Sequence, residues 1–300
     1  MKTKPSFIFG PNISPRYIRS LFLQLDFGIW YSTTEMKDLL RLSGLTIEGK
    51  DIVDKNAGAW ALLRLLEKKN GSVDGGKKYY KLSSLGKELQ ETYSTNQELF
   101  FDIMHYLMYS LWHRSKNPSF GKFWLYASVC KFLWDNAPGT TDSYEITGIL
   151  QNEAQSIFME YEPKFPARSI TAVYTWLSAL TPPFLSKETN RPQLFSKKRE
   201  SCSPQLFHLA LDLLYCQKKL KYGTSIAIGE DEVKDVCRTC LLDESRFWEM
   251  ADRTKMIIRG VDIRRGQFST SIALEMKPQW IDLPDYTQEI EFEGLEGEEE

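Results

Sequence analysis

A short aromatic strand that leads directly into a capped helix, residues 77–89, constrains the fold of this chain most strongly. Its letters are Lys-Lys-Tyr-Tyr-Lys-Leu-Ser-Ser-Leu-Gly-Lys-Glu-Leu. Tyrosines favour strands, and Ser83 is a residue type that caps helix N-termini. Asp74-Gly75-Gly76 comes just before this stretch and tolerates the positive φ of a tight turn. We therefore predict a hairpin over residues 72–82 with its tip at residues 74–76.

Two helices are predicted before the hairpin. Ser32-Thr33-Thr34-Glu35 has capping-box spacing, and the helix that it opens should end at Gly44. Asp54 is a plausible N-cap for a second helix, which should end at Asn70-Gly71. Its buried face is predicted from helical spacing to contain Ala57, Ala61, Leu62, Leu65 and Leu66. Two helices followed by a hairpin predict a winged helix-turn-helix domain over residues 1–93.

A domain of this kind suggests contact with double-stranded DNA. Its second helix enters the major groove while the hairpin lies along the phosphate backbone. Asparagine can pair with adenine, and lysine supplies phosphate contacts. The candidate nucleic-acid-binding residues, all expected at the surface, are Lys50, Lys55, Asn56, Arg64, Lys77 and Lys78. The alternative is a winged fold that binds protein, with these lysines forming an ordinary solvated face.

The charge of the chain is unevenly distributed. Residues 1–90 contain 15 Lys and Arg against 9 Asp and Glu, whereas residues 282–300 contain nine carboxylates and no base. Mutual repulsion predicts that residues 282–300 form a disordered acidic tail. This tail could simply aid solubility, or it could fold over the basic region and compete with DNA.

Residues 94–200 are predicted to form a helical bundle. Helices are expected near residues 97–112, 120–134, 146–161 and 169–180, since these segments are rich in apolar residues. Four tryptophans in them are interpreted as packing groups, because large rings bury much apolar area. They are Trp112, Trp124, Trp134 and Trp176.

Residues 201–281 repeat the order of helices followed by a hairpin, which predicts a second winged-helix-like domain. Helices are expected over residues 205–219, 232–240 and 244–253, with a connector at 225–230. Strands are expected at 256–260 and 268–274, with Arg264 and Arg265 at the tip of the hairpin. These arginines suit a phosphate backbone or an acidic partner, although a solvated turn is equally compatible. The predicted fold class is therefore mainly α with short β-hairpins, α+β.

Catalysis, a resident metal and a cofactor are not expected. The sequence has no phosphate loop, no GxSxG and no HExxH. The Cys237–Cys240 pair has no second pair to complete a zinc site, and His105 and His113 are interpreted as packing residues. No apolar span approaches the roughly 20 residues that cross a bilayer, so a cytoplasmic protein with no membrane partner is expected.

The order of several motifs resembles a prokaryotic domain-of-unknown-function family encoded beside DNA phosphorothioation genes. The motifs are Tyr-Lys-Leu-Ser-Ser-Leu-Gly at 80–86, Leu-Trp-His-Arg-Ser-Lys-Asn-Pro at 111–118 before Phe123-Trp124, and Ser-Pro-Gln-Leu-Phe-His at 203–208. Members of that family usually begin with Phe-x-x-His-Glu-x-Phe, whereas this chain has Phe7-Ile8-Phe9-Gly10-Pro11-Asn12. The resemblance implies a cytosolic, DNA-associated accessory of a sulfur-modification or phage-defence system. It also implies a partner of the phosphoadenylylsulfate-reductase-like sulfurtransferase type.

Two other functions remain open from the sequence. A stand-alone winged-helix transcriptional regulator would bind a short palindrome, which a dimer would read. A protein–protein scaffold would instead use its winged modules to hold protein, and its basic faces would be covered by acidic side chains. The arrangement of charged side chains in the fold helps to separate these alternatives.

Overall fold

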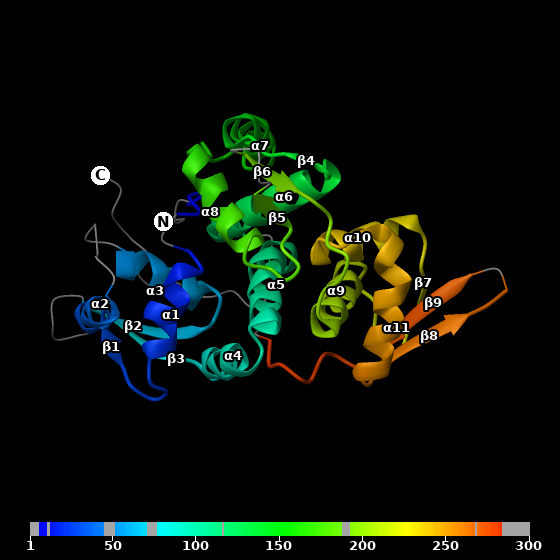
Figure 1. The fold of residues 1–300 in the computed structure, drawn as a ribbon, viewed down its shortest axis with the longest axis horizontal. Coiled ribbons are helices and arrows are strands. Elements are labelled where there is room, and N and C mark those ends of the chain that lie inside the picture. Colours follow the sequence, from blue (N-terminus) through cyan, green and yellow to red (C-terminus); the bar gives the residue numbers. More distant parts are fainter. Residues whose placement is uncertain are drawn as a thin grey trace.

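The computed structural model describes residues 6–10, 13–44, 52–70, 77–115, 117–187, 193–267 and 269–283. These residues form eleven α-helices and three small antiparallel sheets of three strands each, which confirms the α+β class. Figure 1 shows an N-terminal unit on the left, a central bundle around helix α5 (Gln97–Ser115) and a C-terminal unit on the right. None of the described helices combines the length and apolar character that crossing a membrane requires.

The N-terminal unit places three helices around one sheet. Its elements before helix α4 are α1 (Arg16–Ser20), the 3-10 helix η1 (Phe22–Gln24), β1 (Tyr31–Ser32), α2 (Thr33–Leu42), α3 (Ile52–Leu62), β2 (Leu66–Asn70) and β3 (Lys78–Leu82). The strands lie in the order β1-β3-β2, with Leu66 opposite Leu82 and Asn70 opposite Lys78. The predicted hairpin therefore exists, although its predicted tip at residues 74–76 lies outside the described residues.

The first predicted helix begins and ends where its capping residues indicate. The Ser32 hydroxyl accepts from the Glu35 N–H at 3.3 Å, and the Glu35 carboxylate accepts from the Ser32 N–H at 2.7 Å. This is the reciprocal capping box that satisfies two free amides at a helix start. Gly44 has φ of +76°, as a C-terminal glycine should.

The prediction that the second helix continues to Asn70 is wrong. Helix α3 ends at Leu62, and Arg64 adopts a left-handed conformation with φ of 60°. The Leu65 N–H then donates to the Trp60 carbonyl at 2.8 Å, which closes the helix end. Beyond this turn the backbone pairs with β3, so Leu66 is buried through strand pairing and not through helical periodicity.

Helix α4 (Ser84–Thr95) is fixed against the turn that follows α3. The Ser83 hydroxyl accepts from the Gly86 N–H at 3.0 Å and donates to the Arg64 carbonyl at 2.6 Å. A Cβ atom on Gly86 would lie 2.1 Å from the Leu65 carbonyl oxygen, well inside van der Waals contact. Only glycine therefore allows the first turn of α4 to approach this closely.

The central bundle surrounds α5 with apolar helices and carries a small sheet. Its other elements are the 3-10 helix η2 (Pro118–Phe120), α6 (Gly121–Asp135), β4 (Gly139–Thr140), α7 (Ser143–Ile157), α8 (Ala167–Leu177), β5 (Leu185–Lys187) and β6 (Leu194–Ser196). Trp124, Trp134 and Trp176 are buried and Trp112 packs against the core, which confirms their packing role. The sheet, ordered β4-β6-β5, was not anticipated from the sequence.

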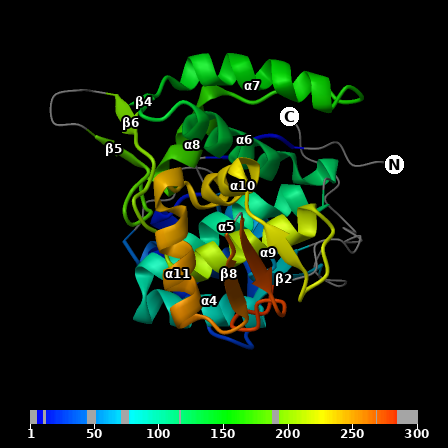
Figure 2. The same ribbon diagram turned by 90° about the vertical axis from the view of Figure 1, so that its right-hand side faces the viewer.

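The C-terminal unit repeats the topology of the N-terminal unit. Its elements are α9 (Pro204–Gln217), β7 (Ser225–Ala227), α10 (Glu230–Cys240), the 3-10 helix η3 (Glu244–Arg246), α11 (Phe247–Ile257), β8 (Val261–Arg265) and β9 (Thr270–Leu274). The strand order β7-β9-β8 matches β1-β3-β2. Figure 2 faces this unit and shows α10 and α11 around α9, with β8 beside them.

Two sequence predictions for this unit are wrong. Residues 256–257 belong to α11, and the strand begins only at Val261, because Gly260 turns the chain with φ of +90°. Arg264 and Arg265 consequently lie within β8 and not at a hairpin tip. The predicted connector at 225–230 contains strand β7, which pairs with β9.

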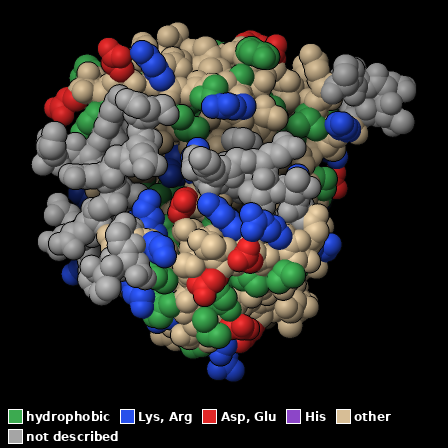
Figure 3. Space-filling view, turned by 90° about the vertical axis from the view of Figure 1, so that its left-hand side faces the viewer, with side chains coloured by type: hydrophobic (Ala, Val, Ile, Leu, Met, Phe, Trp, Pro, Cys, Tyr) green, Lys and Arg blue, Asp and Glu red, His purple; other side chains and the backbone are tan. Residues whose placement is uncertain are grey.

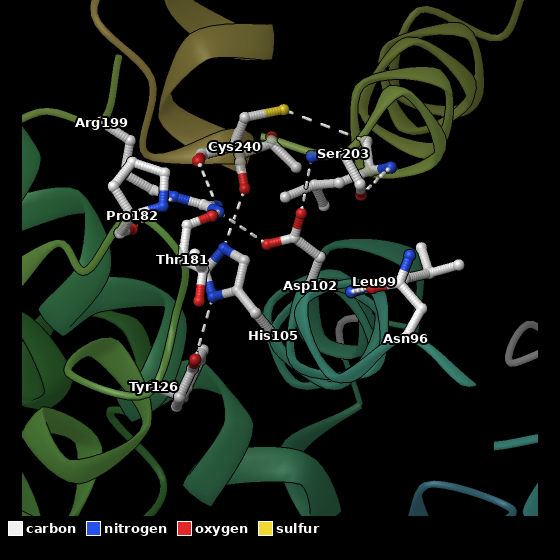
Figure 4. Close-up of polar contacts among 12 residues, drawn as sticks. Asn96, Leu99, Asp102, His105, Tyr126, Thr181, Pro182, Arg199, Ser203 and Cys240 are labelled. Atoms are coloured by element: carbon white, nitrogen blue, oxygen red, sulfur yellow. Dashed lines mark hydrogen bonds and ion pairs between the residues drawn. The ribbon is translucent and has the colours of Figure 1, made fainter. Parts of the chain in front are cut away.

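A buried ion pair joins the C-terminal unit to the bundle (Figure 4). The Arg199 guanidinium lies 2.8 Å from the Asp102 carboxylate of α5, and each residue is only 1% exposed. The other Asp102 oxygen accepts from the Ser203 N–H at 2.8 Å. The remaining acceptors of the guanidinium are the carbonyls of Thr181 (2.7 Å), Pro182 (3.0 Å) and Cys240 (3.3 Å). The pair thereby connects α5, the segment before β5 and the end of α10.

His105 makes a second link one turn further along α5. Its Nε2 lies 2.9 Å from the Thr239 carbonyl, and its Nδ1 lies 2.9 Å from the Tyr126 hydroxyl. A carbonyl can only accept, so Nε2 carries the proton and Nδ1 accepts from Tyr126. Burial lowers the pKa of His105 to about 4, which keeps the ring neutral.

Residues 275–283, which we call the C-terminal strap, return from β9 beneath α5 to the N-terminal unit (Figure 1). The Trp280 indole donates to Nδ1 of His208 at 3.1 Å, and Ile281 and Leu283 are buried. Asp282 and Leu283, which the sequence assigned to the acidic tail, thus belong to the described strap. The rest of the predicted tail, residues 284–300, lies outside the described residues.

Replacing Gly86 with alanine should destabilise the protein by at least about 2 kcal/mol, since the added Cβ overlaps the Leu65 carbonyl oxygen. Helix propensity alone predicts the opposite sign, a gain of up to about 1 kcal/mol. Gly58→Ala in α3 is the matched control, because no atom lies within 4 Å of its added Cβ. Urea unfolding of both variants should give shifts of opposite sign. Equal shifts would contradict the close approach.

Asp102→Ala should cost about 3–5 kcal/mol, because it leaves the buried Arg199 guanidinium without its counter-charge. Asp102→Ala combined with Arg199→Met should recover part of that loss. Asp38→Ala removes an exposed ion pair with Arg41 and should change the unfolding free energy by less than about 1 kcal/mol. Denaturant unfolding measures all three. A double variant no more stable than Asp102→Ala would argue against an unpaired charge as the cause.

Acidification should destabilise the fold through His105. Its folded pKa of about 4 lies below the usual 6.5, so below pH 6.5 the unfolded chain takes up a proton that the folded protein refuses. Stability should fall by roughly 2–3 kcal/mol between pH 6.5 and 4.5 from this group alone. His105→Gln should lose that part of the pH dependence, while His113→Gln on the same helix should keep it. Unfolding free energies at the two pH values provide the comparison.

Candidate nucleic-acid interface

The structure separates the residues predicted on and around α3. Lys55 is exposed on the helix, whereas Lys50 lies outside the described residues. The prediction that Asn56 is at the surface is wrong, because its side chain is completely buried. It falls on the stripe that Val53, Ala57 and Trp60 also occupy, at the i, i+3, i+4, i+7 spacing of a core-facing surface. Asn56 therefore cannot reach a base edge in this conformation.

Arg64 lies in the turn after α3, and its side chain is only partly exposed. It is half-buried, adopts positive φ, and its carbonyl accepts from the Ser83 hydroxyl. Its position fixes the path from α3 into β2. The guanidinium is thus tied to the end of α3, away from the helix start where Lys55 lies.

The face of the β2–β3 hairpin that continues the core carries two lysines near its open end. Strand alternation and the pairing register place Lys68 and Lys78 on the same face as the buried Leu66 and Tyr80. The pKa of Lys68 is lowered, first by burial and then by the charge of Lys78. The two ammonium groups therefore raise the local positive potential. Lys68 was not predicted, since its strand was mistaken for helix.

This lysine-bearing face adjoins the start of α3. Asp54, in the first turn of α3, acts electrostatically on both Lys68 and Tyr80. Lys55 follows Asp54 directly, and Lys77 is exposed next to Lys78. Lys68 and Lys78 therefore lie near the start of α3, and Lys55 and Lys77 are next to Asp54 and Lys78 in the sequence. Figure 3 shows Lys and Arg side chains distributed over this side of the molecule, with carboxylates among them.

The opposite face of the hairpin combines lysines with aromatic rings. Lys69 Nζ lies 4.1 Å from the centroid of the Trp30 ring, and Lys81 Nζ lies 5.1 Å from it. Lys81 also pairs with Glu67 at 2.9 Å. Cation–π contacts of this kind keep ammonium groups close to an aromatic surface. Trp30 escaped the sequence reasoning because its neighbours are set by strand register.

The corresponding hairpin of the C-terminal unit is electrostatically different. Arg264 and Arg265 are exposed as expected, but each is held by a carboxylate. Arg264 bonds to Asp262 at 2.8 Å, and Arg265 bonds to Asp252 of α11 at 2.6 Å. These ion pairs reduce the positive potential available to a phosphate backbone.

The polar groups away from these surfaces provide structural links. Asp102 and Arg199 form an ion pair within the core, and His105 bonds to the Thr239 carbonyl. Each of the three residues is about 1% exposed. In the described part of the chain, no three His, Cys, Asp or Glu side chains cluster as a metal site would require. Burial raises the pKa of the Cys237 thiol, which makes its thiolate less accessible. The surface lysines remain candidate groups for contact with an anion, since ammonium groups attract phosphate.

Comparison with known proteins gives a relationship at the level of fold. No protein-family model matches the chain, and no curated protein matches it. A solved structure described as "SspB crystal structure" superimposes with a TM-score of 0.51 and 11% sequence identity. The match covers 91% of this chain and 81% of that one. The arrangement of the two units around the bundle is therefore similar to the overall fold of that structure.

Proposed function

We propose that the protein is a non-catalytic DNA-binding accessory or targeting subunit, and that its N-terminal unit is a winged helix that contacts duplex DNA. The order helix, strand, helix, helix, hairpin and the strand order β1-β3-β2 support this interpretation. In a winged helix, α3 would be the recognition helix and β2–β3 the wing. The same order in the C-terminal unit supports a second winged helix there.

The observation that carries the DNA proposal is the lysine group between α3 and the hairpin. Among the described residues, neither Lys77 nor Lys78 has an ion-pair partner, and the charge of Lys78 lowers the pKa of Lys68. Cations that repel one another gain when a polyanion lies across them, because phosphates replace water and released counterions add entropy. A duplex backbone supplies phosphates at a spacing that such a group can contact.

The C-terminal unit is better suited to a protein partner. Its hairpin arginines already bind Asp262 and Asp252, so a phosphate backbone would have to displace these carboxylates. This contrast favours DNA binding by the N-terminal unit and protein binding by the C-terminal unit, as a targeting subunit requires. The resemblance to a family encoded beside phosphorothioation genes suggests a DNA sulfur-modification or phage-defence system, with a phosphoadenylylsulfate-reductase-like sulfurtransferase as partner. A scaffold that binds protein at both ends is the second candidate, favoured by these ion pairs.

Lys68→Ala/Lys77→Ala/Lys78→Ala should weaken duplex binding at least tenfold near 100 mM salt. Each lost phosphate contact should reduce the slope of log affinity against log salt by about 0.9, hence by about 2–3 in total. Fluorescence anisotropy with a labelled duplex at several salt concentrations measures both quantities. Arg264→Ala/Arg265→Ala should leave affinity and slope close to those of the unmodified protein. Equal effects of the two variants, or none from the lysine variant, would favour the scaffold.

A further inference from the structure

The outer face of the N-terminal hairpin continues into an exposed apolar loop. Phe27 and Ile29 are 53% and 49% exposed, and Lys87 Nζ of α4 lies 5.1 Å from the Phe27 ring centroid. We call Phe27, Ile29, Trp30, Lys69, Lys81 and Lys87 the aromatic–lysine surface. Large exposed apolar side chains surrounded by cations are suited to a segment that is both apolar and acidic.

The carboxylates already on this surface leave part of its charge available. Lys81 is paired with Glu67, and Lys87 lies 3.7 Å from Glu91. Lys69 has cation–π contacts with Trp30 and Tyr79 but no carboxylate partner within the described ranges. An acidic segment would therefore find, beside exposed rings, an ammonium group that no described carboxylate pairs with.

The C-terminal strap approaches the helix that carries Lys87. Burial, and then the nearby charge of Asp282, raises the pKa of the Glu88 carboxyl on α4, so the strap passes close to α4, where Leu283 is buried. Glu88 is adjacent to Lys87, which lies over the Phe27 ring. The described chain thus reaches α4, the helix that contributes Lys87 to the aromatic–lysine surface.

The sequence that follows has the matching chemistry. Residues 284–300 contain eight carboxylates and no base, and residues 289–293 read Glu-Ile-Glu-Phe-Glu. In an extended conformation, Ile290 and Phe292 project to one side while the glutamates flank them. From this complementarity we propose that residues 284–300 of the same chain dock on the aromatic–lysine surface through Ile290 and Phe292. Long lysine side chains reach around the apolar contact to the flanking carboxylates.

Tethering favours this occupant over a separate peptide. Five residues separate Leu283 from Glu289, so the two can lie at most roughly 20 Å apart. A short tether gives an effective concentration of the order of 1 mM. A contact with an intrinsic Kd of about 100 μM would then be occupied about 90% of the time. Modest complementarity is sufficient within one chain.

Docking also regulates the lysines on the other face of the hairpin. It places carboxylates within about one Debye length, ~10 Å at 0.1 M salt, of Lys77 and Lys78. Their attraction for phosphate falls, so the docked tail weakens duplex binding. This step rests on the proposed DNA-binding function, whereas the docking itself does not.

Zero-length carbodiimide crosslinking of the full-length protein, followed by peptide mass spectrometry, tests the docking. Glu289, Glu291 or Glu293 should form amide links to Lys69, Lys81 or Lys87. A mixture of isotope-labelled and unlabelled protein at low micromolar concentration should give links within one chain and no mixed-isotope pairs. Links to lysines elsewhere, mixed-isotope links or no links would overturn the proposal.

Variants separate specific docking from general charge attraction. Ile290→Ser/Phe292→Ser retains every carboxylate and should reduce the links at least fivefold, as should Phe27→Ala on the surface side. Glu298→Gln/Glu299→Gln/Glu300→Gln removes three charges outside the alternating segment and should leave the links unchanged. If the glutamine variant loses the links and the serine variant retains them, nonspecific attraction explains the result and the docking is wrong.

Duplex affinity separates the regulatory step from the docking. Ile290→Ser/Phe292→Ser should bind duplex about fivefold more tightly than the unmodified protein. If this variant binds duplex no more tightly and the unmodified protein still forms the crosslinks, the regulatory step is wrong and the docking is retained. Absence of duplex binding in every variant would overturn the proposed function, and the crosslinks would still decide the docking.

Discussion

The Asp102–Arg199 ion pair is the interaction on which the arrangement of the whole molecule depends. Taking both charges out of water is costly, and their attraction compensates only when the other polar atoms are also satisfied. Here the guanidinium reaches three carbonyls as well as the carboxylate, and the second carboxylate oxygen accepts from Ser203. These acceptors belong to segments far apart in the sequence. The saturated pair therefore holds the C-terminal unit against α5 in one defined position.

The local features of the fold were predictable where one residue type has one strong preference. Ser32 and Glu35 form the expected capping box, and Gly44 ends the helix as predicted. The boundary after α3 was not predictable in this way, because Leu65 and Leu66 fit helical and strand patterns equally well. Pairing with β3 decides between the two, and that partner comes sixteen residues later, where Leu82 lies opposite Leu66. Local periodicity contains no information about such a pairing.

The candidate interface shows the same division between local and distant information. Lys77 and Lys78 were predicted as candidate residues because they follow a turn signal. Helical spacing from Val53 to Trp60 would have placed Asn56 in the core. Lys68 and Trp30 could not be found, since their roles depend on strand register and on a ring brought from another segment. The pairing of Arg265 with Asp252 likewise depends on how β8 packs beside α11. Whether a charged side chain is already paired therefore depends on tertiary packing and not on local sequence.

The two terminal units share a topology but differ in the electrostatics of their hairpins. A chain that read a symmetric DNA site with both units would need similar charged surfaces on each, since the two half-sites are equivalent. Here Lys77 and Lys78 have no ion-pair partner among the described residues, whereas Arg264 and Arg265 are held by carboxylates. The bundle and the C-terminal strap join these unlike ends into one body. A repeated fold with divergent surface charge is therefore better suited to bringing two different macromolecules together than to binding one of them twice.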